Sequence, residues 1–367
     1  MNVLHVINSL DIGGAQTLLN DALPEFKKNG VRSDVFVLKK STEGNFEQLL
    51  ESNGIKIIYS NTKNIYSPLQ IREIKKVIKE NKYDIVHSHT FPSQYWVSLL
   101  HFMLREGPKL ITTEHNTSNR RREKKVFKYI DNFIYINYSK IICISKGTFN
   151  ELVEWVNIVK DKSIVIENGV NLSKYKNSKP LDKIELVPNY KSNDIIILMV
   201  ARLTNQKDHE TVIKSTLNLP RNIHIVFVGD GEKRSDYENM INKFNLNDRV
   251  HLLGAREDVP NIMKTADLFV LSSHFEGFGL VVVEAMASGL PIIGSNVNGL
   301  TDIISDVGCL FEKGNASQLT EIIMGLVEDP IEQASMIKAG YKKSSLYSIE
   351  KFVNDHINLY NSVLKSV

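Results

Sequence analysis

The sequence has little cysteine and no strong excess of charge. Its 367 residues include two cysteines, Cys143 and Cys309, whose wide separation fits neither a metal-binding pattern nor a disulfide framework. Each lies in an apolar segment, so we expect both to be buried free thiols in a reducing compartment. The net charge is only +3, which gives no overall signal for nucleic-acid binding.

Long apolar runs are also missing, and we expect no leader segment. No apolar run approaches the roughly 20 residues of a membrane-spanning helix. Residues 1–7 lack a basic leader and are too few for a signal-peptide core, so we expect a cytoplasmic protein. The turn that contains Gly13 and Gly14 lacks Gly-x-Gly-x-x-Gly, so it is not a dinucleotide-binding fingerprint.

Short apolar runs alternate with amphipathic stretches along the whole chain, which indicates parallel sheets covered by helices. The length and the 42% hydrophobic content suffice for two cores. We therefore predict an α/β protein of two Rossmann-like units, joined within the Asn-, Ser-, Lys- and Pro-rich segment 171–193, with a ligand cleft between them. The predicted strands are 2–7, 33–38, 56–59, 84–87, 110–113, 140–144 and 163–167, then 195–200, 223–228, 250–253, 267–271 and 291–294.

The chain ends in a predicted amphipathic helix. Such a helix needs an apolar surface to cover. Its apolar residues recur at helical spacing: Ile349, Phe352, Val353, Ile357, Tyr360 and Leu364.

The segment 274–291 carries the clearest functional signal. A Gly-Phe-Gly turn leads into an apolar segment that ends at Gly289 and Pro291, as helices end. Unpaired N–H groups and the positive end of the helix dipole would then suit a phosphate against residues 279–281. The alternative, a purely structural buried helix, explains the valines at 281–283 but not the two glutamates that bracket the turn.

Those glutamates, Glu276 and Glu284, lie before and inside the predicted helix. A wholly helical path between them would be about 12 Å, which exceeds the roughly 5 to 9.5 Å between paired glycosidase carboxylates. We interpret them as contacting the two ends of one ligand, with a diphosphate between. A sugar nucleotide has that shape.

With seven residues between them, these glutamates resemble the signature of retaining glycosyltransferases of the two-Rossmann (GT-B) type. The resemblance implies that 1–172 binds the acceptor and 190–345 the donor, with 346–367 crossing back onto the first unit. It implies transfer of a sugar, with retention, from a nucleotide diphosphate sugar to a hydroxyl acceptor. UDP-sugar is the donor expected from the family, and we expect a lipid-linked saccharide acceptor in bacterial surface-polysaccharide biosynthesis.

Two cations follow the strand 195–200. Arg202 and Lys207 lie at the carboxyl end of this strand, where open α/β sheets bind ligands, and they could neutralise a leaving diphosphate. They resemble the Arg-Leu…Gln-Lys motif of the family, although surface charges in a solvated loop are the alternative. No Asp-x-Asp pair occurs, so we predict no metal and no other cofactor.

The remaining candidates follow strands of both units. Their placement and the family resemblance imply that His115 assists at the transferred sugar, that His87 and His89 bind the acceptor, and that Arg256 lies near the nucleobase. The full predicted site has catalytic Glu276, His115, Arg202 and Lys207; acceptor-binding His87 and His89; and donor-binding Gly13, Gly14, Arg202, Lys207, Arg256, Glu276, Gly277, Phe278, Gly279, Leu280, Val281 and Glu284.

A basic run precedes aromatic residues in the first unit. Such a cluster could hold that unit against an anionic membrane, and a solvated helix face is the alternative. A sugar-nucleotide epimerase and a catalytically inactive partner subunit remain the alternative functions. The residues in question are Arg120, Arg121, Arg122, Lys124, Lys125 and Lys128, followed by Phe133, Tyr135 and Tyr138.

Overall fold

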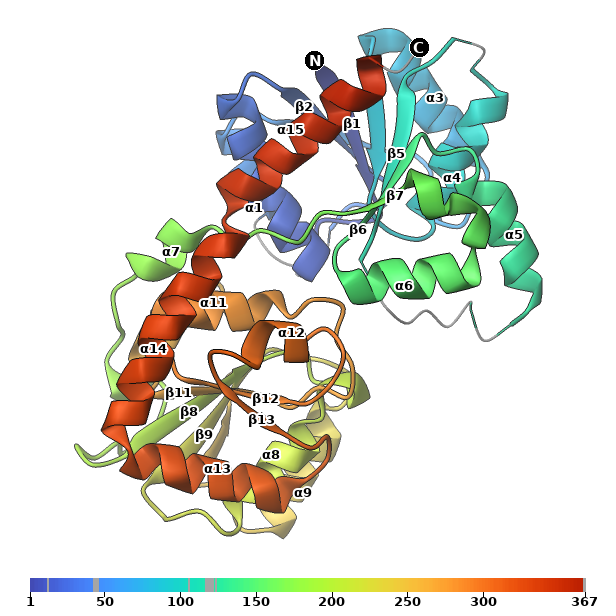
Figure 1. Cartoon of the computed structure of the whole chain (residues 1–367). Coiled ribbons are helices and arrows are strands. Elements are labelled where there is room, and N and C mark those ends of the chain that lie inside the picture. Colours follow the sequence, from blue (N-terminus) through green and yellow to red (C-terminus); the bar gives the residue numbers. More distant parts are fainter. Residues whose placement is uncertain (12, 42–45, 105, 116–121, 123, 366–367) are drawn as a thin grey trace. The chain divides into compact units, whose positions relative to one another are not determined.

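Two compact α/β units, each with a central parallel sheet, make up the protein (Figure 1). The structure, a computed structural model, describes residues 1–11, 13–41, 46–104, 106–115, 122 and 124–365. Unit 1 comprises Met1–Gly169 and Ile349–Val367, and unit 2 comprises Val170–Ser348. The predicted fold class, with two Rossmann-like units, is confirmed.

The sheet of unit 1 has the strand order β3-β2-β1-β4-β5-β6-β7. From β1 the chain passes to β2 on one side, and from β4 it passes to β5 on the other side. The loops after β1 and β4 therefore diverge, which makes this a topological switch point. Asn8 Nδ2, in the first loop, donates to the carbonyl of Phe91 in the second over 2.5 Å. The strands are β1 (Asn2–Ile7), β2 (Arg32–Val37), β3 (Lys56–Tyr59), β4 (Ile85–Ser88), β5 (Lys109–Glu114), β6 (Lys140–Cys143) and β7 (Ser163–Val165).

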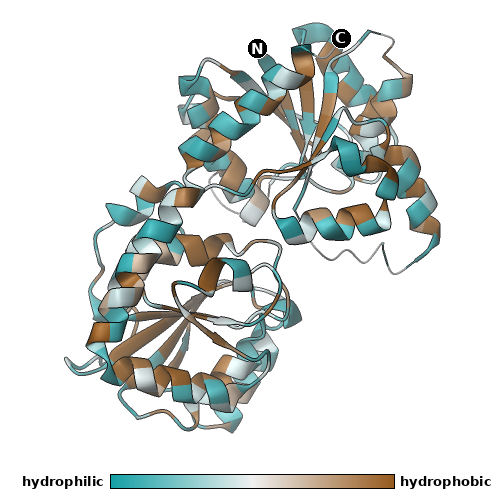
Figure 2. Cartoon of the chain, in the orientation of Figure 1, coloured by the Kyte–Doolittle hydropathy of each residue, from teal (hydrophilic) through white to brown (hydrophobic). Residues whose placement is uncertain are grey.

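Side chains that alternate along the strands feed two separate cores in unit 1. Phe36 on β2 belongs to the core that also contains side chains of α3, α4 and α5, whereas Val35 and Val37 belong to the core against α1 and α2. Figure 2 shows the strands as mostly hydrophobic and the helices as mixed. The helices are α1 (Gly14–Lys28), α2 (Phe46–Ser52), α3 (Leu69–Asn81), α4 (Ser93–Leu99), α5 (Val126–Tyr135), α6 (Lys146–Trp155) and the C-terminal α15 (Ile349–Lys365), with the 3₁₀ turns η1 (Leu100–Phe102) and η3 (Asn157–Lys162).

The C-terminal helix α15 packs against α1 of unit 1 (Figure 1). Its predicted contact residues Phe352, Val353 and Tyr360 are buried. Leu364, however, is 36% exposed, while His356 is 2% exposed on the same helix. The sequence pattern missed His356 because a buried neutral histidine can take an apolar position.

In unit 2 the strand order is β10-β9-β8-β11-β12-β13, with a switch point between β8 and β11. The edge strand β13 was not among the predicted strands. It contains Cys309, which is half-buried, whereas Cys143 on β6 is fully buried as predicted. The strands are β8 (Ile195–Val200), β9 (Ile223–Val228), β10 (Val250–Leu252), β11 (Leu268–Leu271), β12 (Ile292–Ser295) and β13 (Cys309–Phe311).

The segment 171–193, predicted to join the units, belongs to unit 2. Within it Tyr175, Leu186 and Val187 are buried, and α7 contacts α10 and α11. In the described part of the chain, no helix has the length and apolar character to cross a membrane. The helices of unit 2 are α7 (Leu172–Lys176), α8 (His209–Thr216), α9 (Arg234–Lys243), α10 (Val259–Thr265), α11 (Leu280–Ser288), α12 (Thr301–Ile304), α13 (Ala316–Glu328) and α14 (Pro330–Ser344), with the 3₁₀ turns η4 (Lys183–Glu185), η5 (Asn205–Lys207) and η6 (Ser345–Tyr347).

Candidate functional site

The loops after β8 and β11 meet at the switch point of unit 2. The backbone N–H of His274 donates to the carbonyl of Gln206 over 2.8 Å. In return, the Gln206 side chain donates to the carbonyl of Phe275 over 3.0 Å. These reciprocal bonds hold η5, which ends at Lys207, beside the turn that contains Glu276.

Lys207 and Glu276 form a direct ion pair. The Lys207 ammonium donates to Oε1 of Glu276, and the Ser273 hydroxyl donates to the same oxygen over 2.7 Å. Glu276 is only 7% exposed, and a buried carboxylate is costly unless it is paired. Two residues that are 69 positions apart in the sequence, each predicted for the site separately, are thus in contact.

Arg202 lies in the loop directly after β8 and is exposed to solvent. Among the described residues its guanidinium has no ion-pair partner. The loop itself is held in place by its neighbour after β9, because a Cβ on Gly229 or Gly231 would lie 2.1 Å from the Ala201 carbonyl oxygen or 2.4 Å from that of Leu203. A rigid loop therefore presents a cation at the switch point.

The helix α11 begins beside this pair, as the sequence predicts. Gly279 precedes its first residue with φ of +80°, a left-handed conformation that favours glycine, and Gly289 ends it with φ of +84°. Glu284, one turn inside the helix, is half-buried. Phe278 is buried against Tyr347, so this predicted donor-binding residue offers a ligand its backbone rather than its ring. Gly277, Leu280 and Val281 are half-buried along the same turn.

Gly299, in the loop after β12, was not among the predicted site residues. It has φ of +87°, and a Cβ there would lie only 2.4 Å from the carbonyl oxygen of Glu276. Its neighbour Leu300 packs against Gly279, where a Cβ would lie 2.5 Å from Cδ2 of the leucine. The loop after β12 thus packs against the backbone of the Glu276 turn and supports it. The signal in the sequence was the Asn-Gly-Leu string at 298–300.

Arg256 is engaged with a neighbour in its own loop. Its guanidinium donates two hydrogen bonds to the Asp258 carboxylate, over 2.8 and 2.6 Å. This pairing raises the pKa of Arg256 and lowers that of Asp258. The nucleobase contact predicted for Arg256 stays a prediction, and the geometry shows a side chain fixed by a fork-to-fork salt bridge.

In unit 1, the predicted glycines lie where the loop after β1 enters α1. Gly13 is the N-cap of α1 and Gly14 is its first residue. Gly13 has extended backbone, and Gly14 is exposed. Their predicted contact with donor phosphates stays a prediction.

His87 occupies a different place from the one predicted. Its ring is fully buried, and both nitrogens are hydrogen-bonded over 2.7 Å, Nδ1 with the Tyr360 hydroxyl and Nε2 with the Thr113 hydroxyl. It therefore has neither exposed surface nor a free nitrogen for an acceptor. The predicted acceptor-binding role of His87 is corrected to a structural one, the attachment of α15 to the sheet.

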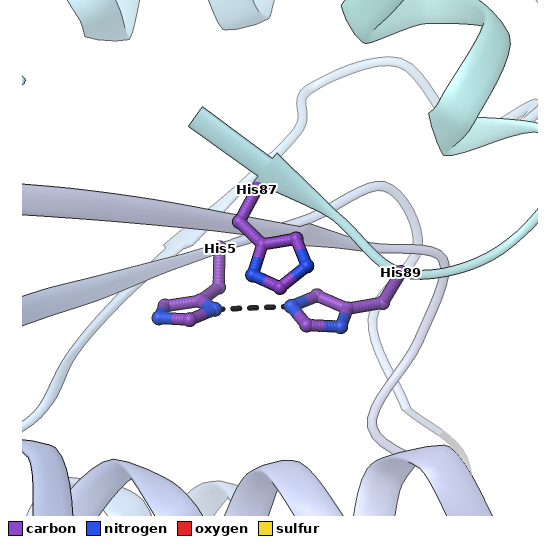
Figure 3. Close-up of side chains that lie close together, drawn as sticks. All are labelled: His5, His87 and His89. Carbon is purple, nitrogen blue, oxygen red and sulfur yellow. Dashed lines mark hydrogen bonds between the residues drawn. The ribbon is translucent and has the colours of Figure 1, made fainter. Parts of the chain in front are cut away.

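His89 and His115 lie closer to the edge of the sheet. The residue His89 is 8% exposed, and its Nε2 atom lies 3.0 Å from Nδ1 of His5 (Figure 3). The His115 ring centroid lies 5.9 Å from that of His89, and its Nε2 has no partner among the described residues. Both histidines follow strands at the carboxyl edge of the sheet. Asn116, Arg120 and Arg121 lie outside the described residues.

Three of these histidines could in principle hold a metal ion. Ligand atoms of His5, His87 and His89 lie within 4.8 Å of one another (Figure 3). A metal would have to displace the hydrogen bond between His5 and His89 or one of those to His87, and no carboxylate of the group would balance its charge. The observed bonds favour a neutral hydrogen-bonded cluster, and metal independence stays a prediction.

Burial makes these histidines hard to protonate. It lowers the pKa of His5 to about 3 and those of His115 and His356 to about 4. Charge repulsion from His356 further lowers the pKa values of His5 and His115. The pKa values of His87 and His89 are also lowered, by burial first and by the neighbouring histidines second. The cluster is therefore uncharged at neutral pH.

We expect unit 1 to lose stability in mild acid. As the pH falls below the ordinary histidine pKa of about 6.5, the unfolded chain takes up protons before the folded chain does. The free energy of unfolding therefore has its full value above that pH and decreases toward pH 4. His5 alone should remove about 2 kcal/mol at pH 5. Urea titrations followed by tryptophan fluorescence report on this unit, because the 2 tryptophans, Trp96 and Trp155, both belong to it.

The matched controls for this titration are two single variants. His5→Leu should reduce the pH dependence without abolishing it, since the four other histidines of the cluster also have lowered pKa values, and substitution of the exposed His101 by glutamine should leave it unchanged. Equal stability of the wild type at pH 7.5 and pH 5 (about 1.5 units below the ordinary value) would contradict the assignment of a neutral cluster.

Comparison with known proteins gives consistent matches over both units. Residues 12–174 match the model "Glycosyltransferase Family 4" and residues 182–343 match "Glycosyl transferases group 1". An Escherichia coli protein, UDP-Gal:alpha-D-GlcNAc-diphosphoundecaprenol alpha-1,3-galactosyltransferase, is 29% identical over 300 residues, which cover 78% of this chain and 77% of that one. An uncharacterized glycosyltransferase of Methanocaldococcus jannaschii is 30% identical over 285 residues, covering 76% and 75%. The structure of Anabaena HepE in complex with UDP-glucose superposes with a TM-score of 0.86 at 22% identity, covering 99% and 100%.

Proposed function

Because the chain belongs to the GT-B glycosyltransferases, we propose that it transfers a sugar, with retention, from a UDP-sugar to a hydroxyl of a lipid-linked saccharide. The observation that carries the proposal is the Lys207–Glu276 ion pair beside the exposed Arg202 and the start of α11. Cations and unpaired N–H groups at a switch point suit a diphosphate. The carboxylate beside them suits sugar hydroxyls.

The lipid-linked acceptor is supported by relatives. The Escherichia coli relative is named for an acceptor on diphosphoundecaprenol, as is a Campylobacter jejuni transferase that is 27% identical over 367 residues. Such an acceptor would bring this protein to the inner face of a bacterial cell membrane. Within unit 1 we assign this acceptor to His89, which follows β4 at the carboxyl edge of the sheet, whereas His115, which follows β5, would assist at the transferred sugar.

In the proposed reaction the acceptor hydroxyl attacks the anomeric carbon on the face from which the diphosphate leaves. A bond forms between the acceptor oxygen and that carbon, the bond to the phosphate oxygen breaks, and the hydroxyl proton passes to the departing phosphate. Arg202 and the N–H groups of α11 stabilise the charge that develops there. Lys207 has three donors, so it can bond Glu276 and a phosphate oxygen together.

Glu276 then orients the hexose while Glu284 accepts hydrogen bonds from the ribose hydroxyls. No metal is proposed in this scheme. Detection of a glycosyl-enzyme adduct by mass spectrometry would contradict the single displacement and indicate a covalent mechanism. Proton NMR of the product reads the configuration directly, and a product anomer opposite to that of the donor would contradict retention.

The function itself is tested by product analysis with and without an acceptor. The full chain is incubated with UDP-sugars, in the presence or absence of a saccharide on undecaprenyl diphosphate. We expect a longer lipid-linked saccharide only when the acceptor is present. Conversion of the nucleotide sugar without acceptor would identify an epimerase, and no conversion or binding of any nucleotide sugar would indicate an inactive partner subunit.

A further inference from the structure

An apolar stripe covers the outward face of α5 in unit 1. The inward face is secured to the core, where Asp131 accepts hydrogen bonds from the Tyr95 hydroxyl and from Nε1 of Trp155. On the other face, Val126, Tyr129 and Phe133 are 59%, 79% and 52% exposed. Such positions, three and four residues apart, lie on one side of a helix.

Further apolar side chains extend this stripe. The Phe102 ring, on η1, stacks against Phe133 with centroids 5.3 Å apart and an interplanar angle of 4°. Phe102 is itself 60% exposed, so the stacked pair forms a raised aromatic surface rather than a core contact. We call this set the α5 surface: Phe102, Val126, Tyr129, Ile130, Phe133 and Ile136, with exposed fractions from 39% to 79%.

Exposed lysines gather at the start of the α5 surface. Lys124, Lys125 and Lys128 are exposed at the start of the helix, and the single acid between 124 and 136, Asp131, is buried. The predicted basic and aromatic cluster is corrected here: Tyr135 and Tyr138 are each 1% exposed. The exposed residues are instead a lysine cluster next to the apolar stripe, the pattern of helices that lie in a membrane interface.

This surface also begins beside the acceptor edge of the sheet. Arg122, four residues before α5, lies 3.7 Å from the Glu114 carboxylate at the end of β5. Glu114 directly precedes His115. The start of α5 is therefore held near His115, the candidate residue for the transferred sugar.

We propose that the α5 surface docks unit 1 onto an anionic lipid bilayer. The aromatic and aliphatic side chains enter the interface, and the three lysines bind lipid headgroups. A second copy of the chain fits less well, because a symmetric contact would bring the same lysines together. The docking deepens the proposed function, on which its purpose rests: it would hold the sheet edge next to a lipid-linked acceptor.

Vesicle sedimentation tests the docking with the full chain. Wild-type protein should bind vesicles of phosphatidylcholine mixed with phosphatidylglycerol, and bind less to phosphatidylcholine alone or in high salt. Tyr129→Ser with Phe133→Ser should weaken binding by about tenfold or more. The exposed Leu69→Ser and Ile331→Ser variants, on α3 and α14, are matched controls that should bind like wild type.

Three outcomes would overturn the docking: no binding of wild type to anionic vesicles, equal binding by the serine double variant, or a dimer in solution that this double variant dissociates. Activity separates docking from the function. With a detergent-solubilised acceptor the double variant should turn over at the wild-type rate, and with acceptor in vesicles it should be slower. Vesicle binding without turnover of any nucleotide sugar would refute the proposed function alone.

Discussion

Replacing Lys207 by alanine is expected to lower kcat by about 10²- to 10³-fold, the loss typical when one preorganised donor to a developing charge is removed. The Lys207 ammonium pairs with Glu276 at the switch point, so its removal takes a cation from the leaving diphosphate and an ion-pair partner from the buried carboxylate. Initial rates at saturating donor measure the effect, and denaturant unfolding measures the accompanying loss of stability.

Arg202→Ala separates the two consequences of the Lys207 change. Arg202 is exposed and has no ion pair among the described residues, so alanine should lower kcat to a similar degree with little effect on stability. Lys214→Ala is the control, because this lysine forms an exposed pair with Glu210 on the same unit and should change neither quantity. Wild-type kcat in both Lys207→Ala and Arg202→Ala would refute the cationic site.

Gly299→Ala is expected to reduce kcat by about 10²-fold, although this residue contacts no substrate in the proposed scheme. Its φ of +87° already disfavours alanine, by roughly 1–2 kcal/mol. The new Cβ would in addition lie 2.4 Å from the carbonyl oxygen of Glu276, so the turn must shift. A displacement of the carboxylate near the reacting sugar is costly even when it is small.

Gly314→Ala provides a matched control for this effect. Gly314 has φ of +81° in the same unit, but no atom lies within 4 Å of the added Cβ. It should therefore show the backbone penalty without the loss of activity. If the two variants lose stability and activity equally, the account of Gly299 as a support for the Glu276 turn is wrong.

Much of this site could be predicted from the sequence because its signals are local. The Gly-Phe-Gly turn, the helix that starts after Gly279 and the cations after β8 each follow from neighbouring residues. The bond between Lys207 and Glu276 could not be predicted in that way. It depends on β11 pairing with β8, a contact between strands separated by two intervening strands in the chain.

The misassigned residues of unit 1 have a similar cause. His87 follows the pattern of a strand-end site residue, yet α15, from the far end of the chain, supplies the Tyr360 hydroxyl that occupies its Nδ1. On α5, both faces carry aromatic residues, so composition alone could not tell which would be buried. In the fold α5 packs against α4, which buries Tyr135, whose hydroxyl donates to Glu114, and leaves Tyr129 exposed to solvent.

The most direct test of the central claim, that unit 2 is a nucleotide-sugar site, is calorimetric binding of UDP, GDP, ADP and their common sugar conjugates to the full chain, with Glu284→Ala alongside. We expect base-selective binding, with UDP preferred. The alanine variant should weaken it by about 10²-fold, since hydrogen bonds to a charged group are worth about 1.5–3 kcal/mol each. Failure of every nucleotide to bind, or equal binding by Glu284→Ala, would contradict the account.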